Sequence, residues 1–460
     1  MKVEIYTDTQ AREITGHVTG VTWTASTRAP YLSASVTLAA PFALLDEIAP
    51  AGEGALDLNA WLVVREIVAG AERAVFAGPV TSYNYTLSAD SGAGLEGLRR
   101  LDALTISAAS PLHHMSEAQI ALSARAVGAP AGHIYQLSEW APIMRELITT
   151  PFRGPYLGAA LARLFELLAA PYRLPRTLAG GASLAGVPVA YDTDTTIEHA
   201  PERVLDARGL TGAAIAAVSA AAAPGGSPWT LISSIFDPDP TIAELFVSLE
   251  PVEDGAAGIG GALGALPVLI HRFRPFTVGA LPSAAAVGAT DAPAHPRARA
   301  SLIEGVISLR AAQTDADRVN AAYITTPLTA SRGVDSFGLI ASPRLDPEDI
   351  DRAGLRLYRA QWPYFPPSKT EGTFAAHSQY IVDVTAQITQ GAERFMSGDI
   401  SARYLPHLRA GLWIKAPIGD HARERRFYGY IESATHSVNV GVGGLITRRS
   451  SLSFTRGFFE

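Results

Sequence analysis

The stretch Ala74–Ser88, AVFAGPVTSYNYTLS, decides the fold of the first part of the chain. On both sides of Gly78-Pro79, aromatic and β-branched residues alternate with small or polar ones, which is the period-two pattern of a strand. Proline lacks the N–H that a sheet ladder needs, so we expect Pro79 at a bulge or at a sheet edge. The stretch therefore predicts two strands separated by a Gly-Pro break.

Four further strand-like stretches precede it: Val3–Tyr6, Ile14–Trp23, Tyr31–Leu38 and Asn59–Glu66. They are rich in valine, threonine and aromatic residues, which favour the pleated, half-buried surface of a sheet. Several short strands in succession are typical of small barrels and sandwiches. We therefore expect residues 1–112 to form a first β domain, a small antiparallel barrel or sandwich.

Residues 113–226 change to an alanine-rich composition, which predicts a partly helical middle domain. A capping box opens a predicted helix at Ser116–Val127, because the serine and the glutamine can satisfy the first backbone N–H groups. An apolar stripe at helical spacing predicts a second helix at Pro155–Ala170. A third, alanine-rich helix is expected at Leu210–Ala223.

Residues 227–300 predict a mixed segment that ends in a linker. We expect a short helix at Ser227–Ile232, followed by strands around Glu244–Val247 and Pro267–Arg272 that pair as a hairpin. Ala280–Ala300 is rich in proline, alanine and glycine, which is typical of a linker.

Residues 301–460 return to β patterns and predict a second barrel domain with a packed helix. The amphipathic stretch His377–Phe395 is the candidate for that helix, and Asp346–Gly354 predicts a shorter one. The predicted strands are Ile303–Arg310, Arg318–Pro327, Asp399–Tyr404, Leu412–Ala416, Arg426–Val440 and Ile446–Arg456. The fold class predicted for the whole chain is α+β and β-rich, with two β-barrel domains bracketing a helical and irregular middle.

The composition excludes several classes of protein. With 460 residues the chain is long enough for two to four domains, and its 48% hydrophobic content is too high for a disordered protein. Because there is no cysteine, disulfides, thiol nucleophiles, iron–sulfur clusters and cysteine zinc sites are excluded. Only 18% of the residues are charged, which is low for a monomeric surface and favours a subunit buried in an assembly.

Charge is distributed unevenly. Residues 401–460 hold nine basic and four acidic residues, a net charge of +5, which leaves −12 for residues 1–400. This pattern fits a basic, partner-facing end on an acidic body, or simply solvated strand edges protected by lysine and arginine. The polar N-terminus is not typical of a signal peptide, and no apolar run is long enough to predict stable membrane insertion.

No stretch carries a strong catalytic signal. His113 and His114 would point to opposite faces of a strand and would chelate one metal poorly. The acidic pairs near Asp192 and Asp237 lack the rest of a calcium loop. The glycine-rich Gly258–Gly264 lacks the strand and helix of a dinucleotide site. We therefore expect no catalytic residue, no cofactor and no metal.

Several segments, in order, carry a resemblance to one family. They are Val75–Val80, Ser227–Ile232, Phe236–Pro238, Glu244–Phe246, Pro267–Phe276, Asp351–Arg356, Gly411–Ile414, Phe427–Ile431, His436 and Leu452–Gly457. Together they resemble the hub proteins of bacteriophage tails, which include baseplate hubs and tail tip hubs, and the N-terminal region of type VI secretion spikes. Residues 113–225 do not follow the family pattern, and we expect any needle or oligosaccharide-binding fold to belong to a separate chain.

The resemblance implies a virion protein of the tail tip that is assembled in the cytoplasm of a bacterial host. It implies a homotrimer whose two tube-like barrels per subunit form a pseudo-sixfold ring. This ring would join the tail tube or distal tail protein ring to a tip, spike or fibre protein, and genomic DNA would pass through it without specific binding. The alternatives are a tail-associated cell-wall hydrolase and a receptor- or carbohydrate-binding tail module.

The resemblance also gives twelve residues an architectural role. They are Phe76, Gly78, Trp229, Phe246, Arg272, Pro275, Gly354, Arg356, Trp413, Tyr428, His436 and Arg456.

Overall fold

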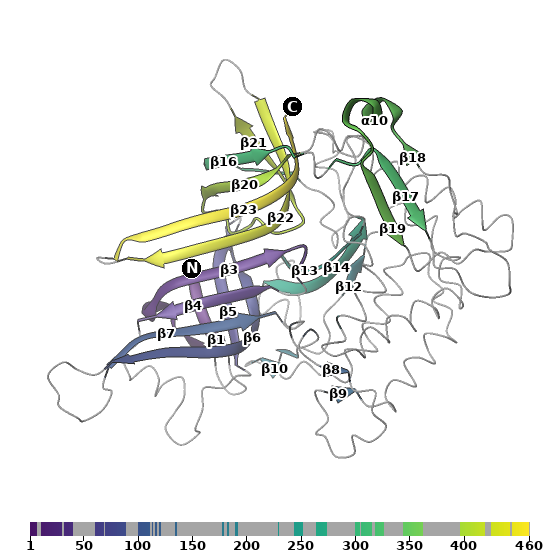
Figure 1. Cartoon of the computed structure of the whole chain (residues 1–460). Helices are drawn as coiled ribbons and strands as arrows, with labels where there is room; N and C mark the ends of the chain where they lie inside the picture. Colours follow the sequence, from purple (N-terminus) through teal and green to yellow (C-terminus); the bar gives the residue numbers. More distant parts are fainter. Residues whose placement is uncertain are drawn as a thin grey trace.

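The structure is a computed structural model of the whole chain, and it describes the β-rich regions at both ends together with parts of the middle (Figure 1). The described residues are 1–6, 11–29, 32–39, 60–68, 70–88, 100–110, 113, 116, 119–120, 134–135, 177–178, 182–183, 189–191, 229, 243–251, 264–273, 300–303, 305–314, 318–325, 344–361, 396–418, 425–441 and 444–459.

One large sheet of 13 strands dominates these residues. In spatial order its path runs through β16 (Val306–Ala312), β20 (Met396–Arg403), β23 (Ile446–Phe459), β22 (Arg425–Val440), β3 (Val18–Ser26), β4 (Ser33–Leu38), β7 (Arg100–Ala109), β6 (Ala71–Ser88), β5 (Trp61–Val68), β1 (Lys2–Tyr6) and β2 (Ala11–Glu13). Off this path, β21 (Trp413–Ile418) pairs with β22 and with β15 (Ala300–Leu302). Every pairing along the path is antiparallel.

The two ends of the chain meet in this sheet, where β3 pairs with β22 from Gly20–Asn439 to Ser26–Ser433. Figure 1 shows the C-terminal strands in yellow continuing edge to edge into the N-terminal strands in purple and blue. Strand β22 is 16 residues long, and its first part pairs with β21 while its second part pairs with β3. Its length therefore lets a single strand belong to both halves of the sheet.

Each half of the sheet has its own apolar core. Strand β5 is buried from Trp61 to Glu66, the near-continuous burial of a strand covered on both faces. The C-terminal half packs Phe427 and Phe454 edge to face, with ring centroids 4.9 Å apart, among buried aliphatic side chains such as Ile400 and Ile414. These cores bury most of the large side chains that the sequence places at alternating positions.

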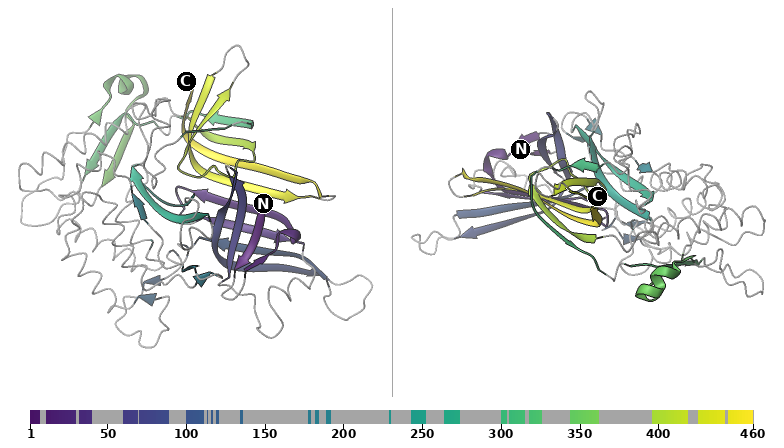
Figure 2. Two further views of the ribbon diagram at one scale, coloured as in Figure 1. Left: turned by 180° about the vertical axis from the view of Figure 1, so that it is seen from behind. Right: turned by 90° about the horizontal axis from the view of Figure 1, so that it is seen from above.

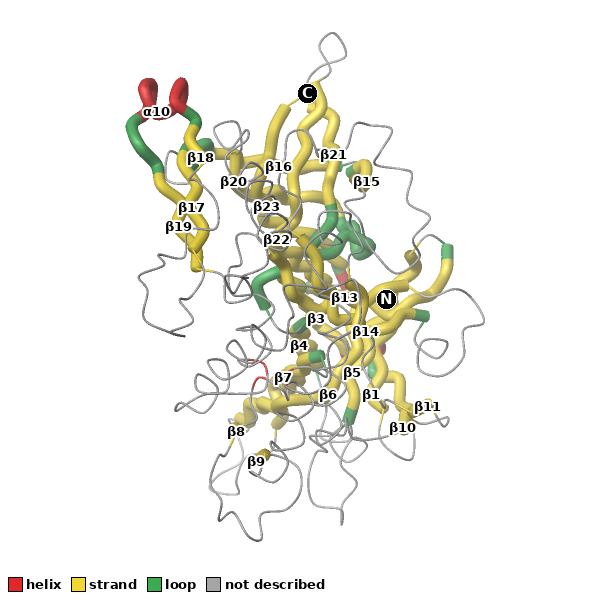
Figure 3. Tube along the Cα trace, turned by 90° about the vertical axis from the view of Figure 1, so that its right-hand side faces the viewer, coloured by secondary structure: helices red, strands yellow, loops and turns green. Residues whose placement is uncertain are grey.

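Smaller elements flank the large sheet (Figures 2 and 3). Strands β13 (Ala243–Pro251) and β14 (Ala265–Phe273) form an antiparallel hairpin, to which β12 (Val189–Tyr191) adds in parallel. Strands β17 (Ala321–Thr325), β18 (Arg344–Leu345) and β19 (Leu357–Gln361) form a second small sheet with helix α10 (Pro347–Ala353), and we call these four elements the α10 unit. Two short pairs remain, β8 (Gln119–Ile120) with β9 (Ile134–Tyr135), and β10 (Thr177–Leu178) with β11 (Ala182–Ser183).

The predicted β-rich fold class is confirmed, as are the hairpin near Phe246 and the short helix after Asp346. The described strands form no closed barrel; they follow an open path from β16 to β2. The predicted helices Pro155–Ala170, Leu210–Ala223 and His377–Phe395 lie outside the described residues, as does most of Ser116–Val127.

Candidate functional site

The Gly-Pro break predicted in the opening stretch was wrong in one respect, because β6 runs through it as one strand of 18 residues. What changes at Gly78-Pro79 is the partner: β6 pairs with β5 up to Pro79 and with β7 from Val80 onward. A bulge between Val80 and Ser82 accompanies the change, as expected beside a proline. The segment thus bends one strand from one part of the sheet into the next.

Gly78 is needed at this bend because β7 ends against it. A Cβ on Gly78 would overlap the carbonyl of Ala109 and lie 2.9 Å from the Cα of Ser110. Phe76, two residues earlier, is fully buried. The close approach at Gly78 and the burial of Phe76 show that both residues lie in tightly packed parts of β6.

The pairing of β3 with β22 is reinforced by a cluster of three rings, and we call the pairing and this cluster the seam. Trp23 and His436 are direct partners in the ladder, and their rings lie 5.2 Å apart at 32°. Tyr404, from the loop after β20, meets both rings edge-on at 6.0 and 6.4 Å. Trp23 and His436 are buried, so the cluster excludes water from the line where the two halves join.

The hydrogen bonds of His436 fix its tautomer. Its Nε2 lies 2.9 Å from the carbonyl oxygen of Leu408 and must therefore donate. Its Nδ1, 2.8 Å from the hydroxyl of Ser450, accepts, while that hydroxyl accepts from the N–H of Leu405 at 2.8 Å. Burial lowers the pKa of His436 to about 4, so the ring is neutral at pH 7. This chain of bonds ties β22 and β23 to the loop between β20 and β21.

A second polar link connects the seam to the N-terminal strands. The hydroxyl of Tyr404 donates to Glu66 on β5 at 2.7 Å. Burial, and then this hydrogen bond, raise the pKa of Tyr404 above its ordinary range. Next to Glu66 on β5, Arg65 donates to Glu4 on β1 at 2.7 Å, and both side chains are buried. The Tyr404–Glu66 hydrogen bond thus adds a polar link between the two halves to the aromatic packing of the seam.

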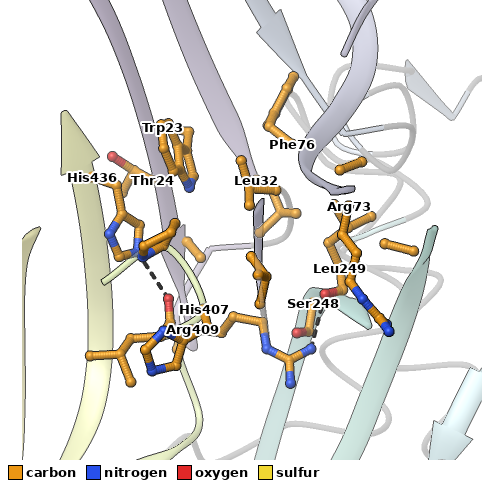
Figure 4. Close-up of a pocket in the computed structure, with 18 of the residues that line it drawn as sticks. Trp23, Thr24, Leu32, Arg73, Phe76, Ser248, Leu249, His407, Arg409 and His436 are labelled. Atoms are coloured by element: carbon orange, nitrogen blue, oxygen red, sulfur yellow. Dashed lines mark hydrogen bonds between the residues drawn. The ribbon is translucent and has the colours of Figure 1, made fainter. Parts of the chain in front are cut away.

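Beside the seam lies a hollow of about 150 Å³, which we call the junction pocket (Figure 4). Strands β3, β6 and β13, the loop before β21, and His436 of β22 all contribute to its wall. Trp23, Phe76 and Leu32 form apolar parts of this wall, while Arg73 and Arg409 line it with charged side chains. The N–H of Arg409 reaches across to the carbonyl oxygen of Leu249 at 2.9 Å.

The α10 unit is organised around one carboxylate. Asp349 of α10 accepts hydrogen bonds from Arg318, at 2.7 Å from its Nε, from Arg352 at 2.6 Å and from Asn320 at 3.1 Å. Asp349 is buried, and the hydrogen bond from Arg318 is the largest of the effects that hold its pKa far below the ordinary range. Asp346 caps the helix by accepting from the N–H of Asp349 at 3.1 Å.

The segment Arg352–Arg356, which the family resemblance singled out, completes this network. Gly354 ends the helix with φ of +76°, a conformation that favours glycine. Asn320 donates to the carbonyl of Gly354 at 2.8 Å and accepts from the N–H of Arg356 at 2.7 Å. The segment therefore contributes a turn and backbone contacts, with the Arg356 side chain exposed.

At the chain's end, Arg456-Gly457 forms a bulge in β23 opposite Gly429. Arg456 has φ of +56°, which is rare for a residue with a side chain. A Cβ on Gly457 would lie 2.6 Å from the ring of Phe454 and 2.7 Å from that of Phe427. The bulge therefore makes room for the central aromatic pair of the C-terminal core.

Two more of the predicted residues lie in an aromatic cluster on β21 and β22. Trp413 and Tyr428 are buried, and Tyr428 stacks on Phe458 with ring centroids 5.1 Å apart. The indole N–H of Trp413 and the hydroxyl of Thr455 have no hydrogen-bond partner.

The remaining predicted residues are scattered. Phe246 is fully buried in β13, and Trp229 is half-buried in a helical turn. Arg272 is the backbone partner of Glu244 in the β13–β14 ladder. Pro275 lies outside the described residues. Of the twelve residues, His436 and Phe76 both line the junction pocket.

Sequence reasoning missed the residues that hold the seam and the α10 unit together. Tyr404, Ser450 and Glu66 carry no motif, and their partners are distant in the chain. Asp349 lies in a helix that was predicted, and its i,i+3 spacing from Arg352 on that helix was a usable signal.

Within the part of the chain that the structure describes, no group of three or more histidine, aspartate or glutamate side chains is placed to hold a metal ion. None of the described helices is long and apolar enough to cross a membrane.

No family model matches the chain, and neither does any curated protein. Among solved structures, the chain is similar to a 43 kDa tail protein of prophage MuSo2 from Shewanella oneidensis, with 12% identity over 99% of this chain and 98% of that one and a TM-score of 0.43. It is also similar to a tail protein from Neisseria meningitidis, with 10% identity over 99% and 96% of the two chains and a TM-score of 0.44. A third similar structure is an E. coli component of the type VI secretion system, with 8% identity over 96% and 73% and a TM-score of 0.38.

Proposed function

We propose that this chain is a structural, non-enzymatic hub of a phage or phage-like tail. In this proposal three copies form a ring with pseudo-sixfold symmetry. One face of the ring binds the tail tube or distal tail protein ring, and the other holds the tip, spike or fibre protein. The protein is then part of the virion, assembled in the cytoplasm of the bacterial host.

The observation that carries the proposal is the seam. It joins an N-terminal and a C-terminal set of strands edge to edge in one chain. Two β-rich units per chain, held at a fixed relative position, give six units in a trimer. A trimer of this kind can match a sixfold tube on one face and a threefold tip on the other. The ordered family-like segments of the sequence support the same proposal.

The described polar groups support a structural role. At the seam, both ring nitrogens of His436 and the donor of the Tyr404 hydroxyl are used in contacts that hold strands together. In the α10 unit, Asp349 is used in the same way. Because these groups already bond to neighbouring strands and loops, their contacts support a structural role.

The proposal includes a central channel through which DNA passes. Phosphate binding needs lysine and arginine side chains, and residues 1–400 carry a net charge of −12. A channel lined by this acidic body would let DNA slide through without being retained.

Particle images of the purified chain test the proposal directly. We expect a threefold ring with a central pore, and a native mass three times the chain mass of 48.5 kDa. A compact monomer at micromolar concentration would overturn it.

A further inference from the structure

The junction pocket has the size of one aromatic ring. Its volume of about 150 Å³ equals that of engineered apolar cavities that bind benzene. Strands β3 and β6, strand β13 and the loop before β21 contribute most of its wall. Strand β6 has a bulge at Val75, and Val75 also lines the pocket. The bulge bends β6 where this strand forms the wall.

The interior of the pocket is suited to an apolar group. Leu32, Ala74 and Phe76 are almost completely buried and line it together with Trp23. His436, which also lines the pocket, already uses both ring nitrogens on Ser450 and Leu408. A guest that enters here therefore gains apolar contact and finds no open hydrogen bond on that ring.

One side of the pocket is positively charged. Figure 4 shows the guanidinium groups of Arg73 and Arg409 both on the side of Ser248 and Leu249. His407 also lines the pocket, and burial followed by the charge of Arg409 lowers its pKa. A carboxylate bound near Arg73 and Arg409 would offset their positive charge and accept charge-assisted hydrogen bonds from their guanidinium groups.

We propose that the junction pocket receives one aromatic side chain of a neighbouring tail protein, with a carboxylate beside that side chain facing Arg73 and Arg409. Buried aromatic anchors in pockets are the residues that dominate binding energy at protein interfaces. The proposal rests on the proposed function, because it takes its partner from the tail assembly. A side chain bound in the pocket would also pack against Trp23 and His436 of the seam.

Two small probes test this chemistry on the isolated full-length chain. N-acetyl-L-phenylalanine carries one ring and one carboxylate, and N-acetyl-L-phenylalaninamide has the ring but no charge. We expect saturable binding of the carboxylate probe by calorimetry, with a Kd of about 1 mM for a ligand of this size. The amide should bind about tenfold more weakly, and only the carboxylate probe should raise the pKa of His407 in NMR titrations.

Variants of the pocket give matched comparisons. Arg73→Gln should reduce the tenfold preference for the carboxylate probe to about twofold, whereas Arg28→Gln, which removes an exposed arginine outside the pocket, should leave it unchanged. Ala74→Leu fills the hollow, so neither probe should bind to the folded variant.

Equal affinity for the two probes, no saturable binding, or the same loss in Arg28→Gln as in Arg73→Gln would overturn the pocket proposal. Its failure is distinguishable from failure of the proposed function. A compact monomer that still binds the carboxylate probe overturns the ring, while a threefold ring that binds neither probe overturns only the pocket.

Discussion

The seam and the α10 unit hold their strands together in opposite ways. At the seam the contacts join residues far apart in the chain, such as the hydroxyls of Thr24 and Thr435, which are 411 positions apart and 3.1 Å from each other. In the α10 unit, Asn320 and Asp349 are only 29 positions apart. The seam depends on buried rings, whereas the α10 unit depends on one carboxylate with three donors.

Because of this difference, we expect mutations in the two regions to destabilise the protein in different ways. Loss of a seam contact removes packing between the two halves of the large sheet, so it should lower the free energy of global unfolding. Loss of an α10 contact should open a small local unit and leave the large sheet intact, since local opening costs less than global unfolding. The experiments below separate these two responses.

The largest effect is expected at Trp23. Replacement by alanine removes the ring that packs against both His436 and Tyr404, and truncating a buried tryptophan costs about 4 kcal/mol of global stability. Denaturant unfolding followed by circular dichroism measures it. Tyr85→Ala is the control, because that ring is 59% exposed and its loss should change stability by less than about 0.5 kcal/mol. Similar losses in the two variants would show that the seam does not govern global stability.

The seam should also lose stability in acid. Because the pKa of His436 in the fold is about 4 and its ordinary value is 6.5, the unfolded chain binds the proton more readily. The stabilisation is therefore complete above pH 6.5 and is lost as the pH falls to about 4, a change of about 3 kcal/mol. Unfolding curves at a series of pH values measure this change. His436→Gln, which cannot titrate, should be less stable at pH 7 and should lose that part of the pH dependence. An unchanged pH profile in the variant would assign the acid sensitivity to other groups.

These two regions also differ in how far the sequence predicts them. Helix α10 was predictable because its signals are local, with Asp346 as cap, Pro347 in the first turn and Gly354 at the end. The strands were predictable from alternation, and the architectural role of His436 stays a prediction. The pairing of Trp23 with His436 was not, because alternation shows which face of a strand is buried and not which distant strand lies beside it. The continuous course of β6 was missed for a related reason: a Gly-Pro pair marks a change of direction, and only the fold shows that the strand continues with a new partner.

An intermediate effect is expected in the α10 unit. Asp349→Asn removes the charge that Arg318 and Arg352 face, and loss of these charge-assisted bonds costs about 2 kcal/mol of local stability. Hydrogen exchange should therefore speed up about 30-fold for the amides of α10 and β17, with no change for β22. Asp351→Asn is the matched control, because this aspartate is exposed on the same helix. Faster exchange in β22 as well would mean that the α10 unit and the seam unfold together.

A smaller loss is expected from Gly354→Ala. The position has φ of +76° with no atom within 4 Å of the added methyl group, so only backbone strain opposes the change. That strain costs about 1 kcal/mol, and it should appear as about fivefold faster exchange in α10. Gly16→Ala has equal space and no positive φ, so it should leave exchange in the large sheet unchanged. A neutral Gly354→Ala would show that the helix end can adopt another turn.

The smallest effect is expected from an ion pair that crosses the seam itself. Arg28 donates to Glu432 at 2.9 Å, but the arginine side chain is 65% exposed. Exposed pairs lose most of their attraction to water and salt, so Arg28→Gln should cost less than about 0.5 kcal/mol and nothing measurable in 0.5 M salt. Unfolding curves at low and high ionic strength measure both values. The loss of stability in Arg28→Gln is compared with that in Trp23→Ala, since both residues lie at the same junction. If the ion pair contributed as much as the buried rings, the seam would be an electrostatic contact, and its stability would follow ionic strength more than packing.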